Sequence, residues 1–194
     1  MRQFKSLAVL GPALFLAGCI SFGPDTPDSL LTLTPTATAP AGGEASVNTG
    51  QSIVLSEFEA PAALDVTRVP VQIDDTSIAY LQNATWVEKP ARLFRRLLGE
   101  TLRARSSRVI VDGDDPGALA ETRLNGTVRQ FGYDARTSSV VVVFDGALPG
   151  AGGSIRSRRF EAIIPNVAPE AAAVGPALNQ AANDVAIQIA EWIG

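Results

Sequence analysis

Apolar and polar residues alternate along the chain in a way that predicts mostly short strands. Runs of strand composition bounded by turn residues recur through its first two thirds. They lie at residues 29–34, 52–58, 69–73, 77–81 and 108–111. We expect each run to form a strand, with a turn at Asp74-Asp75 between the third and the fourth.

Three longer apolar runs follow, and the segments between them have turn composition. The runs cover residues 121–133, 140–147 and 154–164, separated by 134–139 and 148–153. Successive strands joined by short turns usually pair as neighbours. We therefore predict an antiparallel meander in this part of the chain.

Two stretches have the spacing of amphipathic helices. Pro90 suits the first turn of a helix that we expect to end near Ala104, and Gly175-Pro176 predicts the start of a second one near the C-terminus. The apolar positions of the first are Leu93, Leu97, Leu98, Thr101 and Leu102. Those of the second are Leu178, Ala181, Ala182, Val185, Ile189 and Trp192. Its polar face would hold Asn179, Asn183, Asp184, Gln188 and Glu191.

Strands combined with two one-sided helices predict an α+β fold. We expect a mainly antiparallel sheet with both helices packed on one face, because an apolar helix stripe has to be buried against another element. The small residues in the second stripe suit close packing on a sheet better than insertion into lipid.

The N-terminal residues have the pattern of a bacterial lipoprotein signal peptide. Arg2 and Lys5 precede an apolar stretch, 7–16, that is shorter than the ~20 residues of a spanning helix. The run Leu16-Ala17-Gly18-Cys19 closes it with small residues and the single cysteine of the chain. We expect cleavage before Cys19 and lipidation of its thiol. A buried free cysteine is the alternative.

Lipidation at Cys19 would determine where the protein lies in the cell envelope and how the chain is divided into segments. Acyl chains contribute about 0.8 kcal/mol per buried methylene, so the protein would be firmly anchored while its body stays in water. Residue 20 is Ile20 and not aspartate, which favours the periplasmic face of the outer membrane. We expect a signal peptide at 1–18, a tether with the first strand and a flexible loop at 19–51, and the remainder of a single domain at 52–194.

The amino-acid composition limits which partners and catalytic mechanisms this protein could have. The chain has 16 basic and 20 acidic side chains. Loss of Arg2 and Lys5 with the signal peptide makes the charge more negative than the −4 of the whole chain, which argues against a nucleic-acid partner. There is no histidine and no second cysteine, so the commonest general bases, thiol nucleophiles and metal ligands are missing. We expect no enzymatic activity, no cofactor and no metal.

A carboxylate-based envelope hydrolase remains the least favoured alternative. Its candidates are Asp74 with Asp75, or the group Asp112, Asp114 and Asp115. We interpret the second group as a turn, because it lacks the glutamate and the spacing of a calcium loop.

The segments Thr67-Arg68-Val69-Pro70 and 78–98 resemble the ABC-type transport auxiliary lipoproteins, the PqiC-like family. The second includes Trp86-Val87-Glu88-Lys89-Pro90, followed by a helix of arginines and leucines. Leu31 stands where other members often have tyrosine. The resemblance implies an accessory subunit of an MCE-type ABC transport system that moves lipids or other hydrophobic molecules between the two membranes. An MCE-domain protein, a permease and an ATPase would be the partners, and a homo-oligomer is compatible with it. It implies no catalytic residue.

Two alternatives stay open at this stage. The domain could itself carry lipid, with an acyl chain between sheet and helices. Trp86 could fill the core beside the helix or anchor a partner. Arginines are locally frequent in this acidic chain, at Arg92, Arg95, Arg96, Arg103, Arg105 and Arg108. We propose Trp86, Arg92, Arg95 and Arg96 as partner-binding residues, since arginine pairs readily with carboxylates and phosphates.

Overall fold

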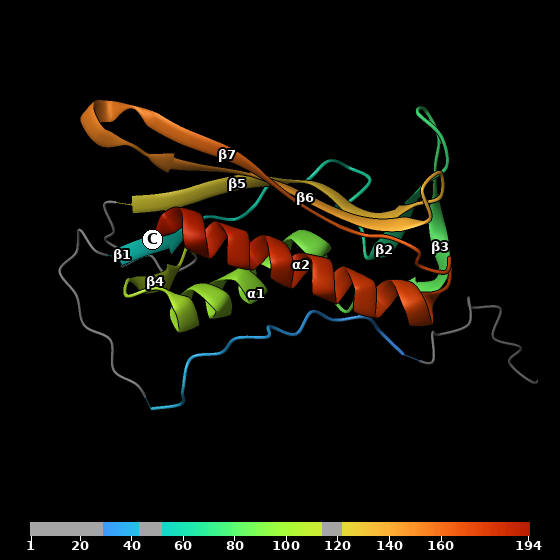
Figure 1. The fold of residues 1–194 in the computed structure, drawn as a ribbon, viewed down its shortest axis with the longest axis horizontal. Coiled ribbons are helices and arrows are strands. Elements are labelled where there is room, and N and C mark those ends of the chain that lie inside the picture. Colours follow the sequence, from blue (N-terminus) through green and yellow to red (C-terminus); the bar gives the residue numbers. More distant parts are fainter. Residues whose placement is uncertain (1–28, 43–51, 114–121) are drawn as a thin grey trace, which may run out of the picture.

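The computed structural model describes residues 29–42, 52–113 and 122–194. Seven strands form one sheet, and two helices, α1 (Pro90–Arg105) and α2 (Ala171–Ile193), lie against one of its faces (Figure 1). The strands are β1 (Ser52–Leu55), β2 (Arg68–Gln72), β3 (Ile78–Thr85), β4 (Val109–Asp112), β5 (Thr122–Asp134), β6 (Ser139–Pro149) and β7 (Ile155–Ile164). The two-helix α+β prediction is therefore confirmed in outline.

The direction of the strands requires a correction. β5, β6 and β7 form the expected antiparallel meander, and β2 pairs with β3 in the same way. However, β1 runs parallel to both β4 and β5, and β2 runs parallel to β5, so the sheet is mixed. The chain between β1 and β4 contains α1, a crossover that returns it in the same direction. β1 is buried at all four residues, as is typical of a parallel strand.

The predicted strand at 29–34 is reduced to a single bridge. Leu31 pairs with Trp86: its N–H donates to the carbonyl of Thr85 at 2.8 Å, and its carbonyl accepts from Val87 at 2.9 Å. No longer ladder forms because the chain then turns onto α2, where side chains take over the hydrogen bonds of the main chain.

Asn179 and Asn183 of α2 hold this segment. Asn179 Oδ1 accepts from the N–H of Thr34 and Asn183 Oδ1 from that of Thr36, both at 2.7 Å, and Asn183 Nδ2 donates to the carbonyl of Thr34 at 3.0 Å. Asn183 is therefore only 3% exposed. This part of the predicted polar face is covered, because these amides replace solvent as partners of the extended chain.

α2 begins four residues before the predicted Gly175-Pro176. Gly175 lies inside the helix because the Leu31 side chain rests on it: a Cβ there would come within 2.8 Å of Leu31 Cδ2. A glycine that resembles a helix boundary in the sequence instead leaves room for a side chain from a segment far away in the chain.

The layer between sheet and helices is a continuous apolar core. Both predicted helix stripes face it; that of α1 is 3% exposed or less, and that of α2 is fully buried except at Trp192. Neither helix in the described residues is long and apolar enough to cross a membrane. The predicted signal peptide, Cys19, Asp114 and Asp115 lie outside the described residues.

Candidate functional site

Trp86, one of the four predicted partner-binding residues, lies in the core. Its side chain is 1% exposed and meets Phe131 edge-on, with 5.7 Å between ring centroids. The main-chain N–H of Trp86 donates to the carbonyl of Thr67 at 2.8 Å. The indole nitrogen has no hydrogen-bond partner in the described part of the chain. The structure thus supports the interpretation of Trp86 as a core residue that fixes the start of α1.

The three arginines of the prediction do come together, on the outward face of α1. Pro90 starts the helix, and Arg92, Arg95 and Arg96 follow at spacings of three and four. Arg92 and Arg96 are exposed and Arg95 is half-buried. The residues between them, such as Leu93 and Leu97, are buried, so packing of the apolar stripe forces the guanidinium groups outward. We call this surface the α1 arginine face.

Two glutamates from outside the helix partly neutralise the α1 arginine face. Glu88, just before α1, pairs with Arg92 at 3.6 Å and also with Arg96. Glu57, which follows β1, pairs with Arg92 at 3.4 Å. Together with Arg95 these side chains line a shallow polar hollow. Three positive and two negative charges leave the face with a net charge of about +1.

The remaining arginines of this region do not join the face. Arg103 is paired with Glu100 at 2.7 Å and lies two helical turns beyond Arg96. Arg103 and Arg105 lie in the last turn of α1, where positive charge is favourable beside the free carbonyls of the helix end. The arginines near the start of α1 are therefore candidates for partner binding, whereas Arg103 and Arg105 stabilise the end of the helix.

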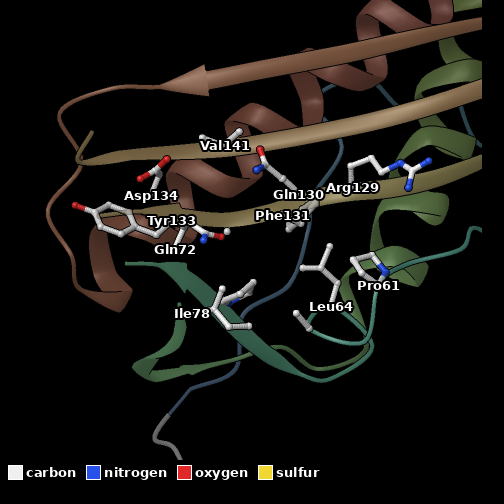
Figure 2. Close-up of a pocket in the computed structure, with 13 residues that line it drawn as sticks. Pro61, Leu64, Gln72, Ile78, Arg129, Gln130, Phe131, Tyr133, Asp134 and Val141 are labelled. Carbon is white, nitrogen blue, oxygen red and sulfur yellow. The ribbon is translucent and has the colours of Figure 1, made fainter. Parts of the chain in front are cut away.

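A second hollow, which no sequence pattern predicts, lies on the opposite face of the sheet (Figure 2). Pro61, Leu64 and Ile78 form its apolar side, with Arg129 and Asp134 at opposite ends. Its volume is about 490 Å³, including the part open to solvent. It forms because the loop before β2 folds over β5 beside a bulge between Val128 and Gln130.

The carboxylates considered for hydrolysis are engaged in other ways. Asp74 accepts from the N–H of Thr76 at 2.8 Å and from its hydroxyl, which lowers the pKa of Asp74. Asp75 pairs with Arg136, which also holds Asp134 and lowers the pKa of that carboxyl. Asp74 and Asp134, held in their ionised form, are poor general acids. Asp114 and Asp115 lie outside the described residues.

The space considered for an acyl chain is filled by aromatic rings. Phe58, Phe94, Phe131 and Phe144 meet between α1 and the sheet, with ring centroids 4.8 to 6.4 Å apart. A lipid chain could enter this layer only by displacing them, and all four rings are at most 5% exposed.

This chain belongs to the family of ABC-type transport auxiliary lipoprotein components, whose model matches residues 31–190. The match includes the Trp86 segment and α1, and it confirms the resemblance seen in the sequence. No curated protein matches the chain in a sequence comparison.

Solved structures share the fold at low sequence identity. Protein XCC0632 from Xanthomonas campestris has a TM-score of 0.70 at 16% identity, covering 85% of this chain and 94% of its own. An uncharacterized protein has a TM-score of 0.64 at 17% identity, covering 86% of this chain and 100% of its own. PelC from Paraburkholderia phytofirmans, a dodecamer, has a TM-score of 0.40 at 12% identity, covering 75% and 95%. At these identities the likeness to XCC0632 and to the uncharacterized protein concerns the fold alone.

Proposed function

We propose that this protein is an outer-membrane lipoprotein that docks the parts of an MCE-type ABC transport system for lipids or other hydrophobic molecules. It acts by binding and has no catalytic role. The proposal is carried by the α1 arginine face: guanidinium groups that a buried stripe forces outward, on a chain whose overall charge is negative.

The chemistry of the face suits a protein partner. A guanidinium group is planar and pairs with carboxylates through two parallel hydrogen bonds, and arginine is enriched among the residues that dominate interface energies. Arg92 and Arg96 already pair with glutamates of this chain, so a partner carboxylate would exchange for or add to those pairs. Trp86 contributes by fixing the start of α1.

The test is reversal of the face in the full chain. Replacing Arg92, Arg95 and Arg96 together by glutamate should weaken co-purification of the MCE-domain protein, the permease and the ATPase. The change of six charge units lies within a Debye length of about 8 Å of a bound partner, so binding of the wild type should also fall as salt is raised.

A matched control reverses Arg105, Arg108 and Arg123, which lie away from the face, and makes the same change in total charge. If the Arg92, Arg95 and Arg96 variant binds like the wild type at low and physiological salt, with a native circular dichroism spectrum, the α1 arginine face is not the docking surface.

Anchoring is tested separately at Cys19. Cys19→Ser should release the protein from the outer membrane without unfolding it, because the acyl chains would lie outside the core. Fractionation of cells expressing the wild type and the variant measures this directly. A serine variant that still sediments with outer membranes as a monomer would show that the anchor is not at this residue.

A further inference from the structure

The first half of β7 is unusually exposed for a strand in a seven-stranded sheet. All five residues 155–159 are exposed, and Ile155 is 77% exposed. β7 pairs with β6 on one side only. The hairpin of β6 and β7 projects beyond the other strands, at the left of Figure 1. We call residues 155–159 the β7 arm.

Two hydrogen bonds show which way the main chain of the β7 arm faces. Gly150 N–H donates to the carbonyl of Ser154 at 2.7 Å across the hairpin, and the carbonyl of Glu161 accepts from Gln188 Nε2 of α2 at 3.0 Å. Residues in an antiparallel pair alternate between bonding to the neighbouring strand and facing away, and the β6–β7 register has no shift. Ser157 and Arg159 therefore have the same parity as Glu161 and face away from β6.

This edge is open where α2 does not reach it. Gln188 covers the edge at Glu161, but no residue in the described ranges bonds to the outward N–H and carbonyl groups of Ser157 and Arg159. Such an edge can accept one more strand, and hydrogen bonds of the main chain then supply the affinity.

The β7 arm is strongly basic. Arg159 binds Asp145 of β6 through two hydrogen bonds, at 2.7 and 2.9 Å, and Arg129 of β5 binds the same carboxylate at 2.8 Å. Two guanidinium groups thus share one carboxylate, and they lower the pKa of Asp145 to about 2, Arg159 with the larger effect.

Arg156 and Arg158 pair with rings. Their guanidinium carbons lie 5.2 Å from the ring centroids of Trp192 and Phe160, and Arg156 also donates to the carbonyl of Trp192 at 3.2 Å. Four arginines and Asp145 sum to about +3, and counting Glu161 reduces this only to about +2.

These observations select the occupant. Two β7 arms paired with each other would place arginines opposite arginines, which is destabilising, so a second copy does not fit symmetrically. The described chain starts beside β3, where Leu31 bridges to Trp86, at the end of the molecule opposite the hairpin (Figure 1). The first described residues therefore lie away from the β7 arm.

We infer that the β7 arm accepts an acidic, extended segment of a partner protein as an eighth strand. Its main chain bonds to Ser157 and Arg159, and its carboxylates meet Arg156, Arg158 and Arg159. The inference rests on the proposed function, because the segment is sought in the subunits of the transport system.

The sharpest test is Ser157→Pro in the full chain, expressed together with the MCE-domain protein, the permease and the ATPase. Proline removes an N–H that faces away from β6, so the β6–β7 ladder stays intact. Loss of one main-chain hydrogen bond should weaken co-purification about tenfold. Ser157→Ala, which keeps the N–H, is the matched control and should bind like the wild type.

Arg156→Glu with Arg158→Glu is the second variant, and it does not change the main chain. It should weaken the same association, more strongly at low salt. Circular dichroism of both variants shows whether β7 remains folded. If the proline variant is unfolded, the double reversal alone decides, and unchanged co-purification would overturn the inference.

A photo-reactive phenylalanine at Ile155 then identifies what touches the β7 arm. The expected cross-link joins it to an acidic segment of a transport subunit. Cross-links to phospholipid or to a second copy would overturn the inference, while the proposed function would stand if subunits still co-purify. If no subunit co-purifies with the wild type, the proposed function itself fails, and this inference fails with it.

Discussion

The α1 arginine face and the β7 arm are both basic surfaces of an acidic protein, yet they differ in how their charge is held. On α1 the arginines stand above a buried stripe and pair with Glu57 and Glu88. On β7 they extend past the core, pair with rings or share Asp145, and keep a larger net charge. Two groups of arginines that look similar in the sequence therefore form surfaces of different net charge, because segments distant in the chain supply the neutralising carboxylates.

The two regions also differ in what their main chain can do. A helix satisfies its own N–H and carbonyl groups except at its ends, so the α1 arginine face can bind only through side chains. An edge strand leaves alternate main-chain groups free, so the β7 arm can bind through both. We also expect substitutions beneath the α1 arginine face to change the free energy of unfolding more than substitutions on the β7 arm.

The largest expected effect concerns the support below each region. Leu97→Ala should destabilise the protein by about 2 to 4 kcal/mol, because Leu97 is buried beneath the α1 arginine face. Ile155→Ala, on the β7 arm, should change the free energy of unfolding by less than about 0.5 kcal/mol. Val185→Ala on α2 should cost somewhat less than the leucine change. Chemical denaturation compares the three, and similar losses at Leu97 and Ile155 would contradict the contrast between the regions.

The next effect concerns Asp145 and pH. Its pKa in the folded state, about 2, lies below its ordinary value of 3.8, so the ionised carboxylate stabilises the fold above pH 4 and this contribution is lost as the pH falls towards 2. Solvent around Arg129 and Arg159 screens the interaction, so we expect about 1 kcal/mol.

Asp145→Asn should therefore be less stable than the wild type at pH 7, and the difference should shrink between pH 4 and 2. Denaturation at a series of pH values measures it. A difference that stays constant down to pH 2 would show that the two arginines do not hold Asp145 in its ionised form.

The smallest effect is expected at Glu88. Its partners Arg92 and Arg96 have side chains more than half exposed, 56% and 59%, and surface ion pairs of this kind contribute about 0 to 1 kcal/mol. Glu88→Gln should change stability by less than about 0.5 kcal/mol but increase association with an acidic partner at low salt. A stability loss above about 1 kcal/mol would mean that the ion pairs of Glu88 help to hold the fold together, and would contradict this prediction.

Much of the fold could be predicted because local patterns there agree with the tertiary structure. The stripe of Leu93, Leu97 and Leu102 has one side that must be buried, and the strands of the meander are joined by short turns. The outward direction of Arg92, Arg95 and Arg96 follows from the same stripe. Where an element packs against its neighbours in sequence, periodicity is sufficient.

The misjudged residues depend on distant partners. Asn183 looks polar and solvent-facing until Thr34 and Thr36 are placed against it. Gly175 looks like a helix boundary until Leu31 rests on it. The predicted strand at 154–164 contains Arg156, Arg158 and Arg159. These charged residues interrupt its apolar pattern, which was the one local sign of an exposed segment. No local pattern showed that this strand would lie at the edge of the sheet.

The two helix stripes, the meander and the family could be predicted from the sequence, because they depend on spacing and composition over short distances. The three-dimensional packing sets the burial of Trp86, the parallel pairing of β1 with β4 and β5, and the partial neutralisation of the α1 arginine face. Each of these depends on which remote segments meet. Pairing across a sheet and between charges is set by the packing of the whole chain, and no local period encodes it.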